Sequence, residues 1–159
     1  MTWPETVERV ASYMRAGGAE ARIEEFLAGT RTAADAARAV GCRTSQIVKS
    51  LVFDCDGRFV LALVPGDRRV DTDKLRLALG CMRAQPARAE QVTGATGYPP
   101  GAVAPFPLPG VERVLADPTL LSHRLVWIGA GSPRHMAAIS PVDLFRLSRA
   151  QPLDVVAEA

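Results

Sequence analysis

Two β-rich runs separated by an Asp-Gly pair constrain the fold of this chain more than any other feature of its sequence. The runs are Ile47–Phe53 and Arg58–Val64, and Asp56-Gly57 lies between them. An aspartate followed by a glycine favours the tight turns that join antiparallel strands, because both residues tolerate a positive φ. The sequence therefore predicts a β-hairpin near the middle of the chain.

Helix signals occur on both sides of this hairpin. Proline in the first turn, capping residues before it and glycines after the last apolar residue mark the ends. The predicted helices run from Pro4 to Gly17-Gly18, from Thr32 to Gly41, from Asp71 to Leu79, from Pro86 to about Gly94, and onward from Ser140. Their expected buried residues are Val7, Val10, Ala11 and Met14 in the first helix and Val142, Leu144, Phe145 and Leu147 in the last.

Four more segments have strand character, namely Ala21–Phe26, Val111–Leu115, Leu125–Ile128 and Met136–Ile139. Strand pairs mixed with several short helices favour an α+β fold, with a curved, mixed and mostly antiparallel sheet surrounded by short helices. The 159 residues contain no repeat or low-complexity tract, so we expect one domain over residues 1–159.

The composition is that of a globular protein, with 48% hydrophobic and 23% charged residues. A net charge of +2 is too small to indicate a nucleic-acid partner by itself. No apolar run approaches the roughly 20 residues that span a bilayer, and the first residues lack the pattern of a signal peptide. We therefore expect a cytoplasmic protein that does not enter a membrane.

The cysteines and histidines give no metal-site pattern. Cys42, Cys55 and Cys81 are an odd set without Cys-x-x-Cys spacing, so we expect neither a disulfide framework nor a zinc site. The three cysteines are interpreted as small buried hydrophobic residues. His123 and His135 also lack the spacing of metal ligands.

Lys49 is the first candidate for a functional side chain. Only two of the 19 basic residues are lysines, and on a strand Lys49 shares one face with Ile47, Leu51 and Phe53. An ammonium group among large apolar neighbours must reach solvent, bind an anion or lose its charge. Two interpretations stay open: a lysine at the floor of a pocket, or an edge-strand lysine that prevents aggregation.

Two loops are further candidates. Residues 94–110 hold five prolines and four glycines, too many for a regular element, and Gly101 lets a ligand approach the backbone closely. This loop either presents main-chain N–H groups to an oxyanion or is a rigid connection. The segment Gly129–His135 joins two predicted strands and contains a histidine. A general base, a phosphate-binding turn and a plain tight turn remain possible for it.

Several segments together resemble the YbaK/EbsC family, which comprises free-standing relatives of the editing insertion domain of bacterial prolyl-tRNA synthetase. The similar segments are Thr30-Arg31-Thr32-Ala33, Ala36-Ala37, Gly41 and Ile47–Phe53, then Thr93-Gly94 and Gly97-Tyr98, the Gly-x-x-x-Pro loop from Gly101 to Pro105, Gly129-Ala130-Gly131 and Ile139–Leu144. The resemblance covers about residues 5–150.

The resemblance implies a YbaK-like fold and hydrolysis, in trans, of the ester between a wrong amino acid and tRNA, with tRNA(Pro) as the expected tRNA. It implies that Lys49 and Gly101 are catalytic, and that a bound water attacks the ester. The expected substrate-binding residues are Val48, Ser50, Ala102, Val103, Pro105, Gly131, Ser132 and His135. The expected partners are a mischarged tRNA and an aminoacyl-tRNA synthetase, without a metal or cofactor.

The chain departs from alanine-specific members of that family. Ser50 follows the lysine where those members tend to carry asparagine, and Ser132–His135 stands where they show His-Pro-x-x-Asn. The expected substrate is therefore an ester of cysteine, serine, threonine or another small amino acid. Two other functions are considered: a binding module that holds tRNA or a synthetase without turnover, and a hydrolase or sensor of a free aminoacyl-adenylate or another small nucleotide.

Overall fold

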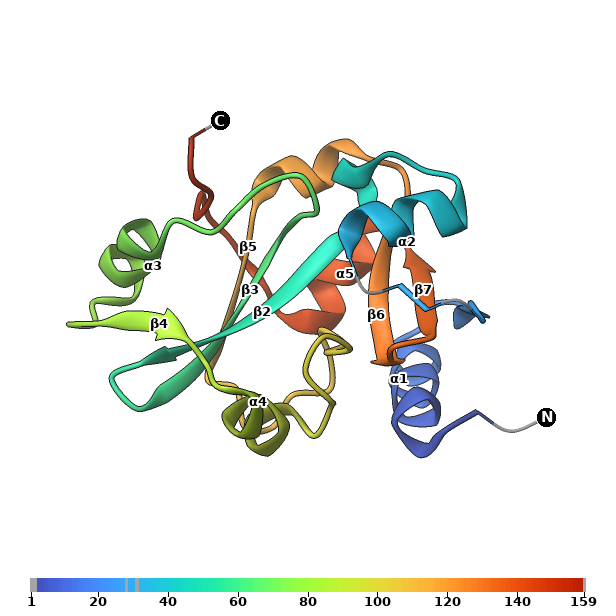
Figure 1. The fold of residues 1–159 in the computed structure, drawn as a ribbon, viewed down its shortest axis with the longest axis horizontal. Coiled ribbons are helices and arrows are strands. Elements are labelled where there is room, and N and C mark those ends of the chain that lie inside the picture. The colour runs from blue at the N-terminus through green and yellow to red at the C-terminus, as the bar shows by residue number, and fades with distance from the viewer. Residues whose placement is uncertain (1–2, 28, 31, 159) are drawn as a thin grey trace.

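The fold is built on two β-sheets that meet at one corner (Figure 1). The computed structural model describes residues 3–27, 29–30 and 32–158, so Arg31 of the Thr30–Ala33 segment lies outside the described residues. Across the larger sheet the strands are β4 (Ala84–Pro86), β2 (Val48–Cys55), β3 (Arg58–Pro65), β5 (Arg113–Ala116) and β8 (Gln151–Pro152). Across the smaller sheet they are β1 (Arg22–Glu25), β7 (His135–Ile139) and β6 (Val126–Ser132).

The predicted hairpin is confirmed as β2 and β3. The two strands pair antiparallel from Val48↔Pro65 to Cys55↔Arg58, and Asp56 and Gly57 form the turn with φ of +54° and +88°. The sheets are mostly antiparallel, as expected, although β3–β5 and β5–β8 pair in parallel. The strands form two sheets where the sequence predicted one. An isolated parallel bridge between Ile47 and Trp127 joins the start of β2 to β6.

Short helices surround the sheets, and local capping fixes where they begin. The Oγ1 of Thr32 accepts the Asp35 N–H at 3.0 Å, and the Oγ of Ser140 accepts the Asp143 N–H at 3.1 Å. The α-helices are α1 (Glu5–Ala16), α2 (Ala33–Val40), α3 (Thr72–Leu79), α4 (Ala89–Thr96) and α5 (Pro141–Ser148). Two 3₁₀ turns, η1 (Thr44–Gln46) and η2 (Pro118–Ser122), complete the described elements.

The main core lies between α1, α5 and the inner faces of both sheets. All four apolar residues predicted for the first helix are buried, and Val10 and Met14 pack in one cluster with Leu61 and Ile128. A second cluster lies under α3, and a third packs α2 against β6 and β7. The start of β2 lies where the first and third clusters adjoin, and this position decides the surroundings of Lys49.

Two local predictions were wrong. Residues 84–86 form the edge strand β4, and the helix that follows starts at Ala89 instead of Pro86, because Ala87 N–H is donated to Val52 O at 2.9 Å. Val142 is 69% exposed, although its spacing predicted a buried position. The buried face of α5 instead consists of Pro141, Leu144, Leu147 and Ser148.

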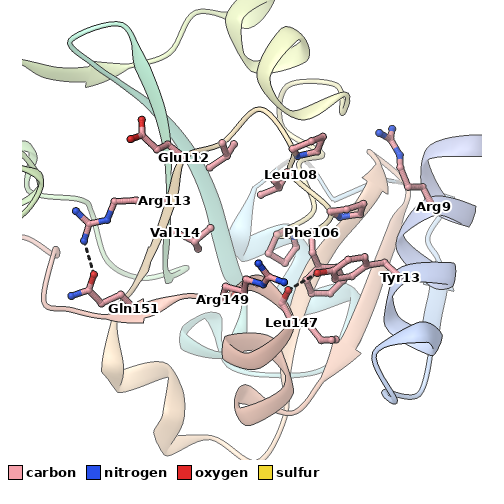
Figure 2. A pocket seen from close by; sticks show the side chains of 15 residues that line it. Arg9, Tyr13, Phe106, Leu108, Glu112, Arg113, Val114, Leu147, Arg149 and Gln151 are labelled. Carbon is pink, nitrogen blue, oxygen red and sulfur yellow. Dashed lines mark hydrogen bonds between the residues drawn. The ribbon is translucent and has the colours of Figure 1, made fainter.

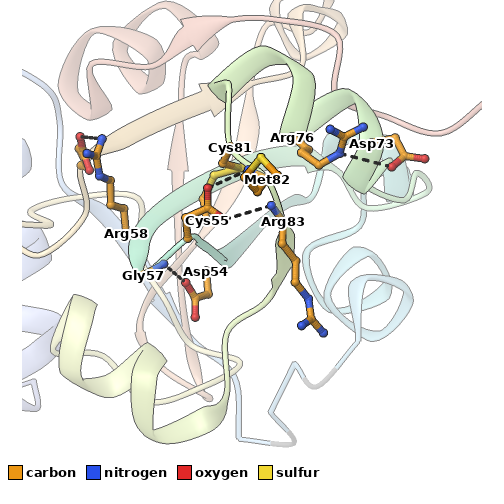
Figure 3. Close-up of a disulfide and its surroundings, with 11 residues drawn as sticks. Asp54, Cys55, Gly57, Arg58, Asp73, Arg76, Cys81, Met82 and Arg83 are labelled. Atoms are coloured by element: carbon orange, nitrogen blue, oxygen red, sulfur yellow. Dashed lines mark hydrogen bonds and ion pairs between the residues drawn. A yellow bond between two sulfur atoms is a disulfide. The ribbon is translucent and has the colours of Figure 1, made fainter.

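The cysteine prediction was also wrong for two of the three residues. Cys55 at the end of β2 and Cys81 after α3 form a disulfide (Figure 3). Pairing of β2 with β4 brings the two cysteines together, and the Asp56 carboxylate accepts the N–H groups of Met82 and Arg83 at 2.7 and 3.0 Å. Cys42 is a free thiol, and burial raises its pKa.

Candidate functional site

A cavity of about 280 Å³ lies where the two sheets meet. Its walls come from the start of α2, the first half of β2, the loop at 101–103 and the hairpin between β6 and β7. These segments are far apart in the chain, and Figure 1 shows α2, β2 and β6 close together. The lining residues are Thr30, Thr32, Ala33, Ala36, Ile47, Val48, Lys49, Ser50, Leu51, Gly101, Ala102, Val103, Gly129, Ser132, His135 and Met136.

Eight of the ten residues predicted for the site line this cavity. The structure places the other two elsewhere. Pro105 lines a second cavity on the far side of the loop. Gly131 faces α1, where its carbonyl oxygen accepts the Thr6 hydroxyl at 2.7 Å and a Cβ would lie 2.9 Å from the Thr6 backbone. Neither residue is brought to the cavity wall.

Lys49 lies half-buried on β2. Its ammonium group donates a hydrogen bond to the backbone carbonyl oxygen of Arg68, which follows β3. Burial lowers the pKa of Lys49, the Arg69 charge lowers it further, and the Asp67 carboxylate acts in the opposite direction. Lys49 forms no ion pair with a described carboxylate, so its charge is positioned by a neutral acceptor.

The loop at 101–103 forms another part of the cavity wall. Gly101 has a φ of +81°, and a Cβ added there would meet nothing within 4 Å. The Ala102 N–H is donated to Pro99 O at 3.0 Å, which closes a turn. Within the described part of the chain, the N–H groups of Gly101 and Val103 are donated to no other residue. These two groups are the main-chain donors that the loop can offer a ligand.

A close backbone contact holds this loop against β6. A Cβ on Gly129 would lie 2.9 Å from the Val103 carbonyl oxygen, so only glycine leaves room for the loop at that position. The glycines of residues 129–131 are visible in the sequence, but Gly129 was not predicted to belong to the site. Its neighbour across the contact is distant in the chain, and no local pattern reveals it.

Ser132 and His135 face each other at the turn end of the β6–β7 hairpin. The Ser132 Oγ lies 2.6 Å from His135 Nδ1 and accepts the Arg134 N–H at 3.0 Å. On the other side of the ring, His135 Nε2 lies 3.6 Å from a Glu25 carboxylate oxygen of β1. The imidazole is 4% exposed, so both partners fix its orientation at the cavity wall.

The remaining polar groups of the cavity are hydroxyls. The Ser50 Oγ is buried and makes no hydrogen bond within the described residues, which leaves it free for a polar ligand atom. Thr30 and Thr32 also line the cavity, although they were not predicted as site residues. Thr32 was predicted only as a helix cap, and that local signal gives no indication that the residue also lines the cavity. No described group of three His, Cys, Asp or Glu residues could hold a metal ion.

The architecture and this cavity define an α+β domain with a small pocket, lined by apolar and polar groups, at the junction of two sheets. Residues 28–147 match the family model of the aminoacyl-tRNA editing domain. The chain belongs to this family. No described helix is both long and apolar enough to span a bilayer.

Similarity to known proteins supports this family membership. A proline–tRNA ligase of Nitratidesulfovibrio vulgaris strain Hildenborough is 36% identical over 113 residues, which cover 70% of this chain and 20% of the ligase. A proline–tRNA ligase of Thermosipho africanus is 36% identical over 114 residues, with 71% and 20% covered. The chain thus spans about a fifth of the length of these relatives. A solved structure described as a candidate trans-editing enzyme for prolyl tRNA synthetase is 33% identical, with a TM-score of 0.91 and 99% and 100% of the two chains covered.

Proposed function

We propose that this protein is a trans-editing aminoacyl-tRNA deacylase that hydrolyses the ester of a small mischarged amino acid on tRNA(Pro). The observation that carries the proposal is the juxtaposition of Lys49 and the Gly101–Val103 loop at one cavity in a chain of the editing-domain family. Similarity to a candidate trans-editing enzyme and to proline–tRNA ligases supports tRNA(Pro) as the substrate.

The size of the cavity supports a small amino acid. A volume of about 280 Å³ lies at the lower end of the range for small-molecule sites, and apolar walls such as Ala33, Ala36 and Met136 limit it. The unbonded Ser50 hydroxyl and the Thr30 hydroxyl offer partners to a polar side chain such as that of serine, threonine or cysteine. A pocket with such partners discriminates by hydrogen bonding as well as by bulk.

The reaction requires only water. The oxygen of a bound water attacks the ester carbonyl carbon, and the developing oxyanion is stabilised by the Lys49 ammonium and by free main-chain N–H groups of the loop. The bond between that carbon and the ribose oxygen then breaks. The ribose oxygen takes up the proton that the water loses, and the neighbouring ribose hydroxyl is our hypothesis for the group that relays it. The products are the free amino acid and uncharged tRNA.

The deciding experiment offers the purified protein tRNA(Pro) charged separately with Ala, Cys, Ser, Thr and Pro. The proposal predicts hydrolysis of at least one non-proline ester, and the same traces should be flat with Lys49→Ala. Hydrolysis that needs an intact tRNA excludes a hydrolase of free aminoacyl-adenylate. Binding of the tRNA 3′ end without turnover of any ester overturns the proposal in favour of a binding module.

A further inference from the structure

A second cavity, of about 570 Å³, lies behind the Gly-x-x-x-Pro loop (Figure 2). The loop separates the two cavities, because Gly101–Val103 line the first and Pro105 lines the second. The walls of the second cavity come from α1, residues 105–114 and the end of α5. Its volume lies within the range that proteins use to bind small organic molecules.

The floor of this second cavity is apolar and firmly held. Phe106 is 1% exposed, and its ring stacks on Tyr13 with the ring centroids 5.2 Å apart. The Tyr13 hydroxyl donates a hydrogen bond to the Leu147 carbonyl oxygen at 3.0 Å, which fixes the ring. Leu108 and Val114 extend the apolar surface. A flat or apolar group can pack against this floor.

Three arginines surround the floor, and none of them pairs with a carboxylate of the described residues. Arg9 donates to the Gly97 carbonyl oxygen at 3.0 Å, and Arg113 donates to a side-chain oxygen of Gln151 at 2.5 Å. No hydrogen bond of the Arg149 guanidinium occurs within the described part of the chain. Figure 2 shows Arg149 between Val114 and Tyr13, with Arg9 and Arg113 at opposite ends.

Few acidic side chains offset the arginines that line this cavity. Glu112 is the acidic residue of its lining, and it already lies 3.4 Å from Arg58. Three positive charges and one negative charge leave an excess of two positive charges around an apolar floor. Guanidinium groups bind phosphate with paired hydrogen bonds, and a phosphate monoester carries nearly two negative charges at neutral pH.

The backbone of Arg149 is a separate sign that its side chain serves this cavity. Arg149 follows α5 with a φ of +56°, in the left-handed region that residues with a Cβ avoid. The equivalent positions after α2, α3 and α4 are all glycine, at Gly41, Gly80 and Gly97. An arginine kept in a strained conformation points to a function for its side chain.

We propose that this second cavity binds an organic phosphate, in which guanidinium groups hold the phosphate and the floor takes up a flat or apolar body such as a nucleobase. The phosphate belongs either to a free mononucleotide or to a nucleotide within an RNA strand. The proposal does not rest on deacylation, since its test measures binding alone.

The test is calorimetric titration of the intact protein with AMP, with adenosine and with uncharged tRNA(Pro). If a free nucleotide is the ligand, AMP binds at least tenfold more tightly than adenosine, and Arg149→Ala removes that difference. If an RNA nucleotide is the ligand, AMP binding is weak and Arg149→Ala weakens tRNA binding by roughly 10-fold or more, the loss expected for hydrogen bonds to a charged group. Binding of both probes that is unchanged by Arg149→Ala overturns the proposal.

Two more variants separate a binding role of Arg149 from a structural one. Arg149→Gly removes the guanidinium and also relieves the backbone, so affinity falls while the melting temperature rises. A lower melting temperature with unchanged affinity shows that Arg149 is structural and overturns the proposal. Arg124→Ala is the matched control. Arg124 is exposed and lies outside this cavity, and its substitution removes the same charge as Arg149→Ala. Its affinity for both probes should equal that of the wild type.

Discussion

The Lys49 ammonium group donates a hydrogen bond to the backbone carbonyl oxygen of Arg68, at the entrance to the loop that follows β3. A carbonyl oxygen orients an ammonium group but does not neutralise it. No described carboxylate pairs with Lys49, which suits the role toward an ester oxygen that we propose for it. This arrangement differs from that of Lys74, the second lysine of the chain, which pairs with the Asp154 carboxylate at 3.1 Å.

This difference between the two lysines predicts the outcome of a matched pair of substitutions. Lys49→Ala should lower the rate of ester hydrolysis by roughly 100-fold or more, the usual effect of losing one oxyanion donor. The melting temperature should change little, because a half-buried charge is removed together with its desolvation cost. Lys74→Ala should keep the full hydrolysis rate and slightly lower the melting temperature. Equal rates for Lys49→Ala and the wild type would remove Lys49 from the site.

The pH dependence of stability gives a second prediction about Lys49. Burial lowers its pKa in the folded chain below the ordinary value of about 10.4. Between the lowered pKa and the ordinary value, the unfolded chain binds a proton that the folded chain lacks, so folding becomes more favourable as pH rises through this window. Lys49→Met lacks this contribution. The melting temperature of the wild type should therefore rise relative to that of Lys49→Met as pH approaches the ordinary lysine pKa of about 10.4 from below.

Other ionisable groups cancel from this comparison because they titrate alike in both proteins. They include Tyr98, for which burial raises the pKa to about 12. A melting temperature of the wild type that falls relative to Lys49→Met over the same window contradicts the lowered pKa.

Gly101 provides a test of the loop itself. A Cβ at Gly101 meets no protein atom, so a larger side chain there extends into open space at the cavity. Gly101→Val should lower ester hydrolysis strongly, because the side chain blocks the approach of the ester to the backbone and valine disfavours a φ of +81°. The measurement is the hydrolysis rate on the most reactive charged tRNA(Pro). A rate near that of the wild type contradicts the proposed role of the loop.

Local signals predicted the parts of the fold that depend on neighbours in the chain. The Asp56-Gly57 turn and the caps at Thr32 and Ser140 are confirmed because each depends on residues at most a few positions apart. The strand β4 was missed because three residues carry no periodic pattern, and its existence depends on pairing with β2. The Cys55–Cys81 disulfide follows from that same long-range pairing.

Eight of the residues that line the cavity at the sheet junction were named as site residues from the sequence for a different reason. Lys49, the Gly-x-x-x-Pro loop and the β6–β7 hairpin are recognisable as motifs, but their relative placement depends on how the two sheets meet. Gly131 faces α1 although it lies only two positions after Gly129, because the pairing of β6 with β7 is irregular between Gly129 and Ser132, and the close contact with the loop falls at Gly129. Such a contact between distant backbones has no signature in a single sequence.

That close contact predicts a positional effect of glycine. Gly129→Ala should move the Val103 carbonyl and the loop away from β6, because its Cβ would lie only 2.9 Å from that oxygen. We expect a loss of roughly 1–3 kcal/mol in the free energy of unfolding and a lower hydrolysis rate. Gly94→Ala is the control: its Cβ meets nothing within 4 Å on α4, so stability should stay the same or rise slightly. Equal stability of Gly129→Ala and the wild type would show that the loop moves away from β6 at no cost in free energy.

The disulfide predicts a redox-dependent stability that leaves the site intact. Cys55 and Cys81 are 26 residues apart, and closing a loop of that length stabilises a folded chain by about 3 kcal/mol. Reduction should therefore lower the melting temperature by roughly 6–12 °C for a chain of this size. A variant with Cys55→Ser and Cys81→Ser should melt at one temperature with or without reductant, whereas Cys42→Ser should respond as the wild type does. Alkylation of all three cysteines in the native, unreduced protein contradicts the disulfide.

Because Cys55 lies at the end of β2 that is far from Lys49, the hydrolysis rate below the melting transition should be the same in both redox states.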